Sequence, residues 1–163
     1  MELNAHWPKI MKVFEKAMGN YAVATVTADG NPYITPIGSI FLRDDMTGFY
    51  FEQYPKNLVE NLKANSRVAV LAVNFHKVFW LHSFLRGNYP APPAVRLFGV
   101  AGERRRATSQ ELARFRNSFW VRIIRLMRLK GYGITWEPMH HVRDIRFDSF
   151  EPIVAGEMTR GNW

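Results

Sequence analysis

The sequence predicts a single α+β domain made mainly of antiparallel strands, with helices at its flanks. Three strand-like segments separated by turn sequences follow one another between residues 21 and 53, which favours an antiparallel meander. Segments with helical spacing of apolar residues precede and follow them. With 163 residues the chain is near the usual size of one domain, and it can bury about two-thirds of its unfolded surface. We therefore expect residues 1–163 to form one domain.

The first helix is expected at residues 8–18. Pro8 suits the first turn of a helix, and Gly19 with Asn20 suits its end. Between them, apolar residues recur at helical intervals, so one face of this helix should be buried.

A hairpin and a third strand are expected next. Residues 21–28 and 33–41 favour strands, and the turn sequence at 29–32 joins them. Aromatic residues at 49–53 are typical of the third strand.

The second half adds a short helix after Pro55 and further strands. Residues 67–73 form an almost wholly apolar run that suits a central strand. Residues 95–101 and 143–150 alternate well enough for two more strands. Residues 75–94 show no regular pattern, and we expect an insertion or a lid there.

A long basic helix is expected at residues 108–130. It begins with the capping-box sequence Thr108-Ser-Gln-Glu111 and should run to about Lys130. The chain carries 22 Lys and Arg against 14 Asp and Glu, a net charge of +8. Much of that surplus lies in residues 104–130, where Glu111 is the single acidic residue.

This basic helix allows three interpretations. An apolar stripe could pack it on the domain and leave a solvated basic face, which is what most amphipathic helices do. It could also bind an anionic membrane surface or a partner protein. Nucleic acid is unlikely as a partner, because no recognition motif accompanies the arginines.

Composition excludes several classes of function. The chain has no cysteine, so disulfides, thiolate metal sites and cysteine nucleophiles are impossible, and a reducing cytoplasm is the expected compartment. We find no signal-peptide pattern and no apolar stretch of about 20 residues, which predicts a soluble protein. Hydrolase and nucleotidase motifs are also absent.

The order of elements and three sequence segments resemble the pyridoxamine 5′-phosphate oxidase-like family of FMN-binding split β-barrels. Residues 24–37 look like the family's opening hairpin, residues 61–70 like its helix-to-strand passage, and residues 96–102 like the strand that follows. The resemblance implies an antiparallel split β-barrel with flanking helices that forms a homodimer. It also implies FMN in clefts between subunits, with a deazaflavin or haem as alternatives.

For function, the resemblance implies a flavin- or deazaflavin-dependent oxidoreductase acting on a small organic substrate. The alternative is a non-enzymatic haem- or flavin-binding protein on the same barrel. No catalytic residue is named, because in flavin chemistry the cofactor carries the hydride while the protein supplies position and electrostatics.

The resemblance also suggests where a cofactor would lie. Lys56, at the start of a helix, is the first candidate for its phosphate. Thr35 and Ile37 are expected to line the flavin edge through their backbone, although many relatives carry an arginine at the position of Thr35. The remaining candidates are Gln53, Tyr54 and Asn57.

The histidines offer a second place for haem or a metal. His76 and His82 lie in the insertion, and His140 is followed directly by His141. Adjacent histidines point apart in a strand, and no ligand spacing typical of a metal site is present, so no protein-built metal site is expected.

Overall fold

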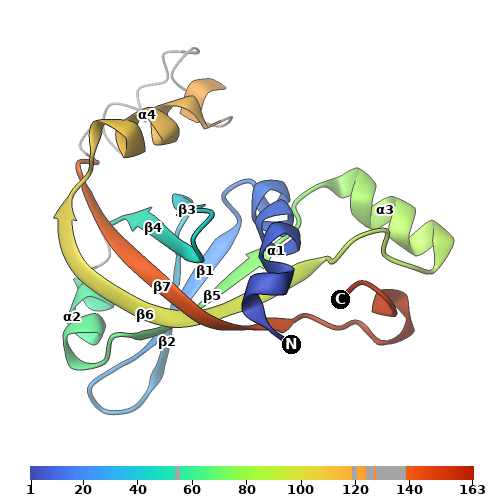
Figure 1. The fold of residues 1–163 in the computed structure, drawn as a ribbon, viewed down its shortest axis with the longest axis horizontal. Helices are drawn as coiled ribbons and strands as arrows, with labels where there is room; N and C mark the ends of the chain where they lie inside the picture. The colour runs from blue at the N-terminus through green and yellow to red at the C-terminus, as the bar shows by residue number, and fades with distance from the viewer. Residues whose placement is uncertain (54–55, 119–120, 124–126, 128–138) are drawn as a thin grey trace.

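The computed structural model describes the whole chain except residues 54–55, 119–120, 124–126 and 128–138. The strands are β1 (Tyr21–Val26), β2 (Pro32–Pro36), β3 (Ile40–Leu42), β4 (Thr47–Phe51), β5 (Arg67–Val73), β6 (Ala94–Arg106) and β7 (His141–Pro152). The helices are α1 (Leu3–Ala17), α2 (Lys56–Ala64), α3 (Lys77–Arg86) and α4 (Ser109–Asn117), followed late in the chain by the short 3-10 helix η1 (Gly156–Thr159). The strands form one antiparallel sheet in the order β2-β1-β5-β6-β7-β4-β3 (Figure 1). The prediction of a mainly antiparallel fold with flanking helices is confirmed.

The sheet curls because its two longest strands, β6 and β7, bend together (Figure 1). Their pairing shifts register between Phe98 and Gly99 and again between Ala101 and Arg104, as expected where bulges increase twist. At the first shift the two backbones are very close, and a Cβ on Gly99 would lie 2.4 Å from the carbonyl oxygen of Arg146. Only glycine fits this position without moving a strand.

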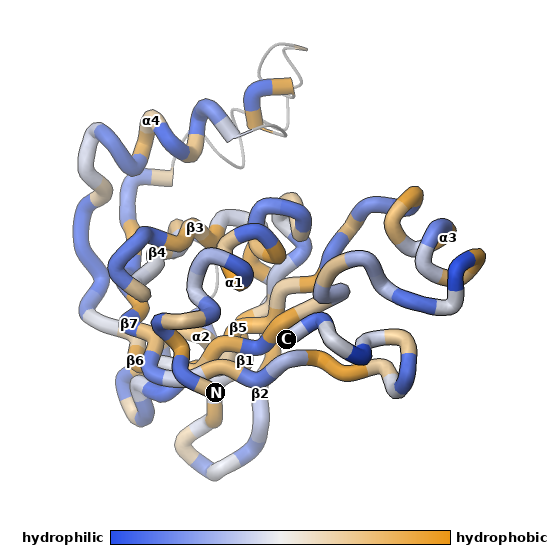
Figure 2. The backbone as a smooth tube through the Cα atoms, turned by 45° about the vertical axis from the view of Figure 1, so that its right-hand side comes forward, coloured by the Kyte–Doolittle hydropathy of each residue, from blue (hydrophilic) through white to orange (hydrophobic). Residues whose placement is uncertain are grey.

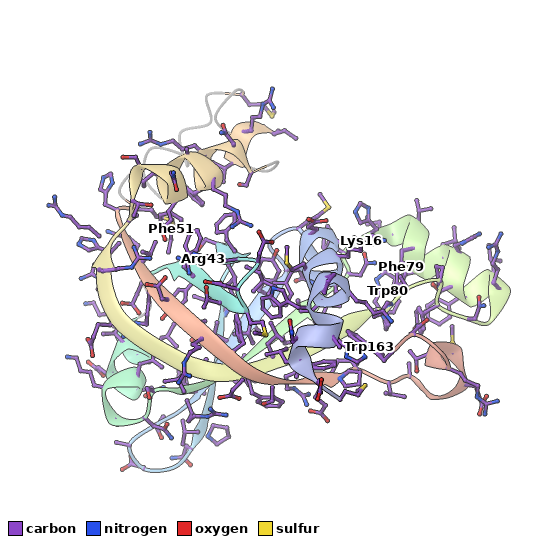
Figure 3. All side chains as sticks on the ribbon, in the orientation of Figure 1. Lys16, Arg43, Phe51, Phe79, Trp80 and Trp163 are labelled. Atoms are coloured by element: carbon purple, nitrogen blue, oxygen red, sulfur yellow. The ribbon has the colours of Figure 1, made fainter. Side chains whose placement is uncertain are left out.

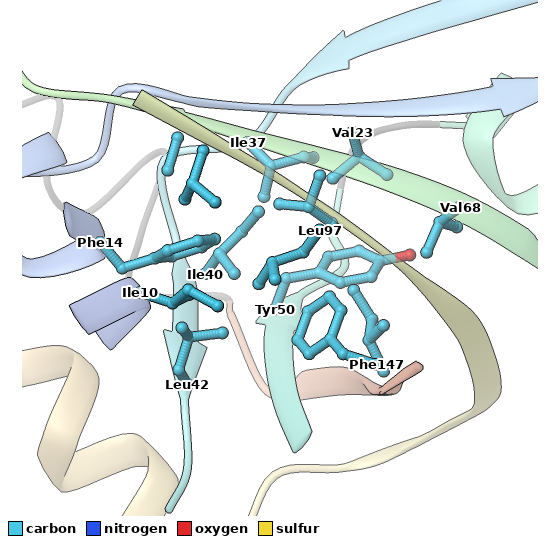
Figure 4. Close-up of a cluster of buried hydrophobic side chains, with 14 of the residues drawn as sticks. Ile10, Phe14, Val23, Ile37, Ile40, Leu42, Tyr50, Val68, Leu97 and Phe147 are labelled. Carbon is cyan, nitrogen blue, oxygen red and sulfur yellow. The ribbon is translucent and has the colours of Figure 1, made fainter. Parts of the chain in front are cut away.

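Helix α1 packs into the concave side of the curled sheet and contributes a row of side chains to the main core (Figure 4). Two hydrogen bonds fix its position. Trp7 Nε1 donates to the carbonyl oxygen of Arg43 at 2.8 Å, and the Tyr21 hydroxyl donates to the carbonyl oxygen of Phe14 at 2.8 Å. The buried residues of α1 are Trp7, Ile10, Val13, Phe14 and Ala17.

Helix α4 begins with the predicted capping box. The amide of Glu111 donates to Thr108 Oγ1, and the amide of Thr108 donates to the Glu111 carboxylate. The apolar side of α4 packs on a second cluster of buried side chains, whose aromatic members stack closely; Phe51 and Phe115 have ring centroids 4.6 Å apart. Within α4, the apolar side that carries Leu112 and Phe115 therefore faces the sheet, whereas Met127, farther along the basic region, is 62% exposed.

An ion-pair cluster holds the first turn of α4 to the sheet. Arg105 donates two hydrogen bonds to Glu111 and two to Asp144, at 2.6–2.9 Å. Arg43 bridges the same two carboxylates at 2.7 and 2.8 Å. The hydrogen bonds from Arg105 lower the pKa of Glu111 to about 2 and also lower the pKa of Asp144. We refer to these four residues as the α4 ion cluster.

Several predicted boundaries were wrong. The first helix starts at Leu3, with Pro8 inside it, and does not start at residue 8. The expected strand 33–41 is two strands, β2 and β3, separated by residues 37–39.

Two larger predictions also need correction. Residues 75–94 are not irregular, because Lys77–Arg86 form α3. The helix expected at 108–130 is interrupted: α4 ends at Asn117, because Ser118 adopts an extended backbone with φ −61° and ψ 144°, and residues 121–123 are helical again. Most of the expected helix beyond Ser118 lies outside the described residues.

The C-terminal residue packs on its own chain. The ring of Trp163 lies 5.5 Å from that of Phe150, and Lys9 Nζ lies 5.9 Å from its centroid (Figure 3). Lys9 also donates to the carbonyl oxygen of Asn162 at 3.0 Å. These contacts hold the tail against α1.

Candidate functional site

The predicted site residues Thr35 and Ile37 lie at one edge of the sheet. The amide of Ile37 donates to the carbonyl oxygen of Tyr21 at 3.1 Å, and the Ile37 side chain is buried in the main core. Thr35 is paired with Val23. Since hydrogen-bonded pairs alternate along an antiparallel ladder, the backbone polar groups of Thr35 also face β1. The backbone of both residues therefore joins strands, and the free polar atom is Thr35 Oγ1, which is buried without a partner among the described residues.

The outer side of β2 is an open strand edge. The same alternation turns the backbone nitrogens of Pro32, Ile34 and Pro36 away from β1. Two of these three nitrogens belong to prolines and cannot donate, which protects the edge from pairing with a foreign strand.

Two other predicted residues, Gln53 and Lys56, line one hollow of about 270 Å³ beside α2. Gln53 lies two residues after Phe51, the last residue of β4. Its Oε1 is buried without a hydrogen-bond partner among the described residues. Lys56 is the first residue of α2 and is exposed. The remaining lining residues are Glu52, Val59, Glu60, Lys63 and Arg104.

A buried ion pair lies at the base of the hollow. Glu52 is 2% exposed and accepts two hydrogen bonds from the Arg143 guanidinium, at 2.7 and 3.0 Å. Tyr50 donates its hydroxyl proton to Glu52 at 2.8 Å, and Arg104 lies 3.8 Å from the same carboxylate. Burial and the Glu52 charge raise the pKa of the Tyr50 phenol, which therefore stays neutral. These contacts fix the wall of the hollow.

The hollow has a surplus of positive charge. Among its lining residues, Lys56, Lys63 and Arg104 are positive and Glu52 and Glu60 are negative, which leaves one positive charge. Arg143, which is not a lining residue, pairs with Glu52. A phosphate monoester carries a charge of about −1.5 to −2 near neutral pH and would be attracted by this positive surplus. The first turn of α2 adds the partial positive charge of a helix N-terminus.

Asn57, another predicted site residue, does not line the hollow. Asn57 donates from Nδ2 to the Tyr33 hydroxyl at 3.0 Å, and so links α2 to β2. Tyr54 lies outside the described residues.

A larger cavity of about 500 Å³ lies between α1, α4 and β3. Its walls are mostly apolar, with Glu15 and Arg114 as the charged lining residues. The Arg114 guanidinium lies 5.5 Å from the centroid of the Phe41 ring. Residues 38–42, which directly follow Ile37, border this cavity. The cavity therefore adjoins the connection between β2 and β3, the two edge strands of the sheet.

The histidines are dispersed. His76 and His82 belong to the α3 region, whereas His140 and His141 precede and begin β7. Partial burial and the Arg104 charge lower the pKa of His141. In the described part of the chain, no three His, Asp or Glu side chains come together in a way that could hold a metal ion.

Comparison with known proteins gives the family. The model of the pyridoxamine 5′-phosphate oxidase family matches residues 12–151, most of the chain. The chain belongs to the pyridoxamine 5′-phosphate oxidase-like family. Among curated proteins none matches it.

Solved structures with this fold are named for different cofactors. An FMN-binding protein from Syntrophomonas wolfei is 12% identical with a TM-score of 0.57, and the match covers 94% of this chain and 95% of that one. HutZ, a haem storage protein from Vibrio cholerae, is 16% identical with a TM-score of 0.56, covering 93% and 95%. An F420 reductase is 14% identical with a TM-score of 0.53, covering 86% and 94%. At these identities the likeness shows a shared split-barrel fold.

None of the helices within the described ranges is long and apolar enough to cross a bilayer. The compartment in which the protein works stays a prediction.

The predicted site residues omitted five lining residues of the hollow: Glu52, Val59, Glu60, Lys63 and Arg104. Lys56, Glu60 and Lys63 follow the i, i+4, i+7 spacing of one helix face, so their pattern was available in the sequence. Arg104 comes from β6, and no local pattern connects it with α2.

Proposed function

We propose that this protein binds a phosphorylated redox cofactor, FMN in the first place, and acts as an oxidoreductase on a small organic substrate. The observation that carries the proposal is the hollow beside α2. It combines a surplus of positive charge with Gln53 Oε1, a buried polar atom without a partner among the described residues. A buried acceptor without a donor costs free energy, and a ligand N–H or hydroxyl would remove that cost.

The chain's residues suit the phosphate end of such a cofactor. Lys56 and Lys63 would bind the phosphate, and Arg104 offers a planar donor set at the same hollow. The ion pair between Glu52 and Arg143 would hold the wall in place. A bound flavin would supply the electron-accepting ring, and Thr35 Oγ1 and Gln53 Oε1 are the free polar atoms of the predicted site residues available to orient it.

We also propose that two copies of the chain complete the site. The hollow of about 270 Å³ is smaller than the pockets of roughly 300–1,000 Å³ that hold most ligands of this size. A second copy would add the missing walls. The check is the mass in solution by light scattering, which should be twice the chain mass of 19.0 kDa.

The test of cofactor binding compares FMN with riboflavin, which lacks the phosphate. Binding is followed by the quenching of flavin fluorescence. The affinity for FMN should be at least about tenfold higher than that for riboflavin, because hydrogen bonds to a charged group contribute about 1.5–3 kcal/mol. The double variant K56Q/K63Q should lose most of this preference and leave riboflavin binding unchanged. Lys12, an exposed lysine of α1 outside the hollow, gives the matched control K12Q.

Equal affinity for FMN and riboflavin would contradict a phosphate site in the hollow. A deazaflavin with a phosphorylated side chain should show the same dependence on Lys56 and Lys63. A haem absorption band without flavin binding would instead support the haem-binding alternative, with the four dispersed histidines as the candidates to substitute.

Enzyme and binding protein are then distinguished by turnover. In an oxidoreductase, a reduced nicotinamide or a reducing substrate should bleach the bound flavin, and an oxidant should restore its colour repeatedly. A binding protein should hold the flavin through the same treatment without redox cycling.

A further inference from the structure

Helix α3 is held to the rest of the molecule by one face. Trp80 Nε1 donates to the carbonyl oxygen of Asn74 at 2.8 Å, and the rings of Phe79 and Tyr89 stack with centroids 5.7 Å apart (Figure 3). Ser83, on the same side of the helix, is fully buried. These contacts determine the rotation of α3 about its axis, so its opposite face must point outward.

That outward face is apolar. Val78, Leu81 and Leu85 follow helical spacing and are 78%, 63% and 77% exposed, and Phe84 beside them is 66% exposed. Figure 2 shows hydrophobic segments along the backbone of α3. Phe75, just before the helix, is 51% exposed. Of the nine large apolar side chains that are strongly exposed among the described residues, five therefore lie at positions 75–85. The polar face of a surface helix normally faces the solvent. Contiguous exposed apolar side chains mark interaction sites.

The charges around this face are positive. Residues 75–94 contain Lys77 and Arg86 and no Asp or Glu. Lys16 of α1 lies next to this segment, because the amide of Phe75 donates to the carbonyl oxygen of Lys16 at 3.1 Å. The side chain of Lys16 is exposed (Figure 3). At the nearby η1, Glu157 is paired with Arg160 at 2.6 Å. An apolar helix face flanked by cations suits the surface of a membrane with anionic headgroups.

A second copy of the chain fits this face less well. Two α3 helices face to face would bring Lys77 and Arg86 of both copies together, with no acidic residue in 75–94 to offset them. This objection does not apply to an anionic lipid surface.

We propose that the outward face of α3 docks the protein on an anionic membrane surface. Leu81, Leu85, Val78 and Phe84 enter the boundary between headgroups and acyl chains, while Lys77 and Arg86 contact the headgroups. The docking is peripheral, because α3 has 10 residues and cannot cross a bilayer.

The experiment is co-sedimentation of the full chain with vesicles of phosphatidylcholine alone or with phosphatidylserine added. The wild type should pellet with the anionic vesicles at low salt, and added salt should weaken this binding because it screens the headgroup charge. The variant L81Q/L85Q removes apolar contacts from two exposed positions and should reduce vesicle binding at least tenfold. Ile34 on β2 is equally exposed at 68%, so I34Q is the matched control and should bind like the wild type.

Three results would overturn the proposal. One is the absence of wild-type binding to anionic vesicles at low salt. Another is binding that survives L81Q/L85Q, which would place the contact elsewhere, for example on the basic residues of α4. The third is a halving of the mass in solution by L81Q/L85Q without vesicles, which would make the face an interface between copies. Unchanged melting temperatures of the variants show that each comparison concerns folded protein.

Discussion

Substitution of Glu111 by glutamine tests how much the α4 ion cluster contributes to stability. Glutamine still accepts the hydrogen bond from the amide of Thr108, so the capping box is kept. What the variant loses are the charged contacts with Arg43 and Arg105, at 2.7–2.9 Å. The Glu111 side chain is only 10% exposed, so solvent screens these contacts little.

The magnitude follows from the pKa of Glu111, which hydrogen bonds from Arg105 lower from 4.5 to about 2. A shift of this size corresponds to about 3 kcal/mol at neutral pH. Because the pKa is lower in the folded than in the unfolded protein, this stability is present above about pH 4.5 and is lost as the pH falls toward 2. Asp144 still pairs with both arginines in the variant. We therefore expect E111Q to lower the free energy of unfolding at pH 7 by about 2–3 kcal/mol.

Urea unfolding of wild type and E111Q at equal protein concentration measures the difference. The difference should stay constant between pH 7 and pH 5.5. It should fall to roughly half near pH 3, because there Glu111 is largely protonated in the unfolded protein and still largely ionised in the folded one. A difference below about 0.5 kcal/mol at pH 7, or one that does not shrink with acid, would refute the reasoning. E111A, which removes the capping box as well, should cost about 1 kcal/mol more than E111Q.

Three further substitutions test other parts of the fold. E52Q should destabilise the protein by about 3–5 kcal/mol because it leaves the buried Arg143 charge without its partner; the double variant E52Q/R143M should recover much of that loss in urea unfolding, and full additivity of the two changes would contradict the pairing. G99A should cost about 1–3 kcal/mol, because its Cβ would lie 2.4 Å from the carbonyl oxygen of Arg146; a neutral effect in thermal unfolding would show that the strands move apart easily. D148N removes an exposed ion pair on β7 and should change stability by less than about 1 kcal/mol, and a larger loss would show that the pair is not solvated.

Strands and turns were predictable from the sequence where local chemistry determines them. The turn at 29–32 and the apolar run at 67–73 give β1 and β5 near their observed bounds, and also the start of β2. Such segments combine strand-favouring residues with clear turn signals. The capping box at Thr108 was likewise visible, since both of its hydrogen bonds are local in sequence.

Helix α3 could not be predicted for a physical reason. Sequence analysis recognises a helix by a polar face opposite an apolar one. In α3 large apolar side chains lie on the outward face as well as on the inward one, so this alternation is weak. The failure and the inferred membrane contact thus have the same cause, a helix whose exposed side chains do not suit water.

The candidate site was partly predictable. Gln53 and Lys56 line the hollow, and the family resemblance was enough to select them. Arg104 and the ion pair of Glu52 with Arg143 depend on the pairing of β4 and β6 with β7, which joins residues as far as 91 positions apart in sequence. Long-range pairing of this kind leaves no local signal.

The two proposed surfaces should work independently. The hollow lies beside α2, whereas α3 lies at the other end of the molecule's longest axis (Figure 1). A membrane under α3 would therefore leave the hollow open to cofactor and substrate. The affinity for FMN should be the same with and without anionic vesicles, and L81Q/L85Q should leave it unchanged. An FMN affinity that changes more than about threefold, close to 0.7 kcal/mol, when vesicles are added would show that lipid binding and cofactor binding are coupled, and the separation of the two surfaces would then be wrong.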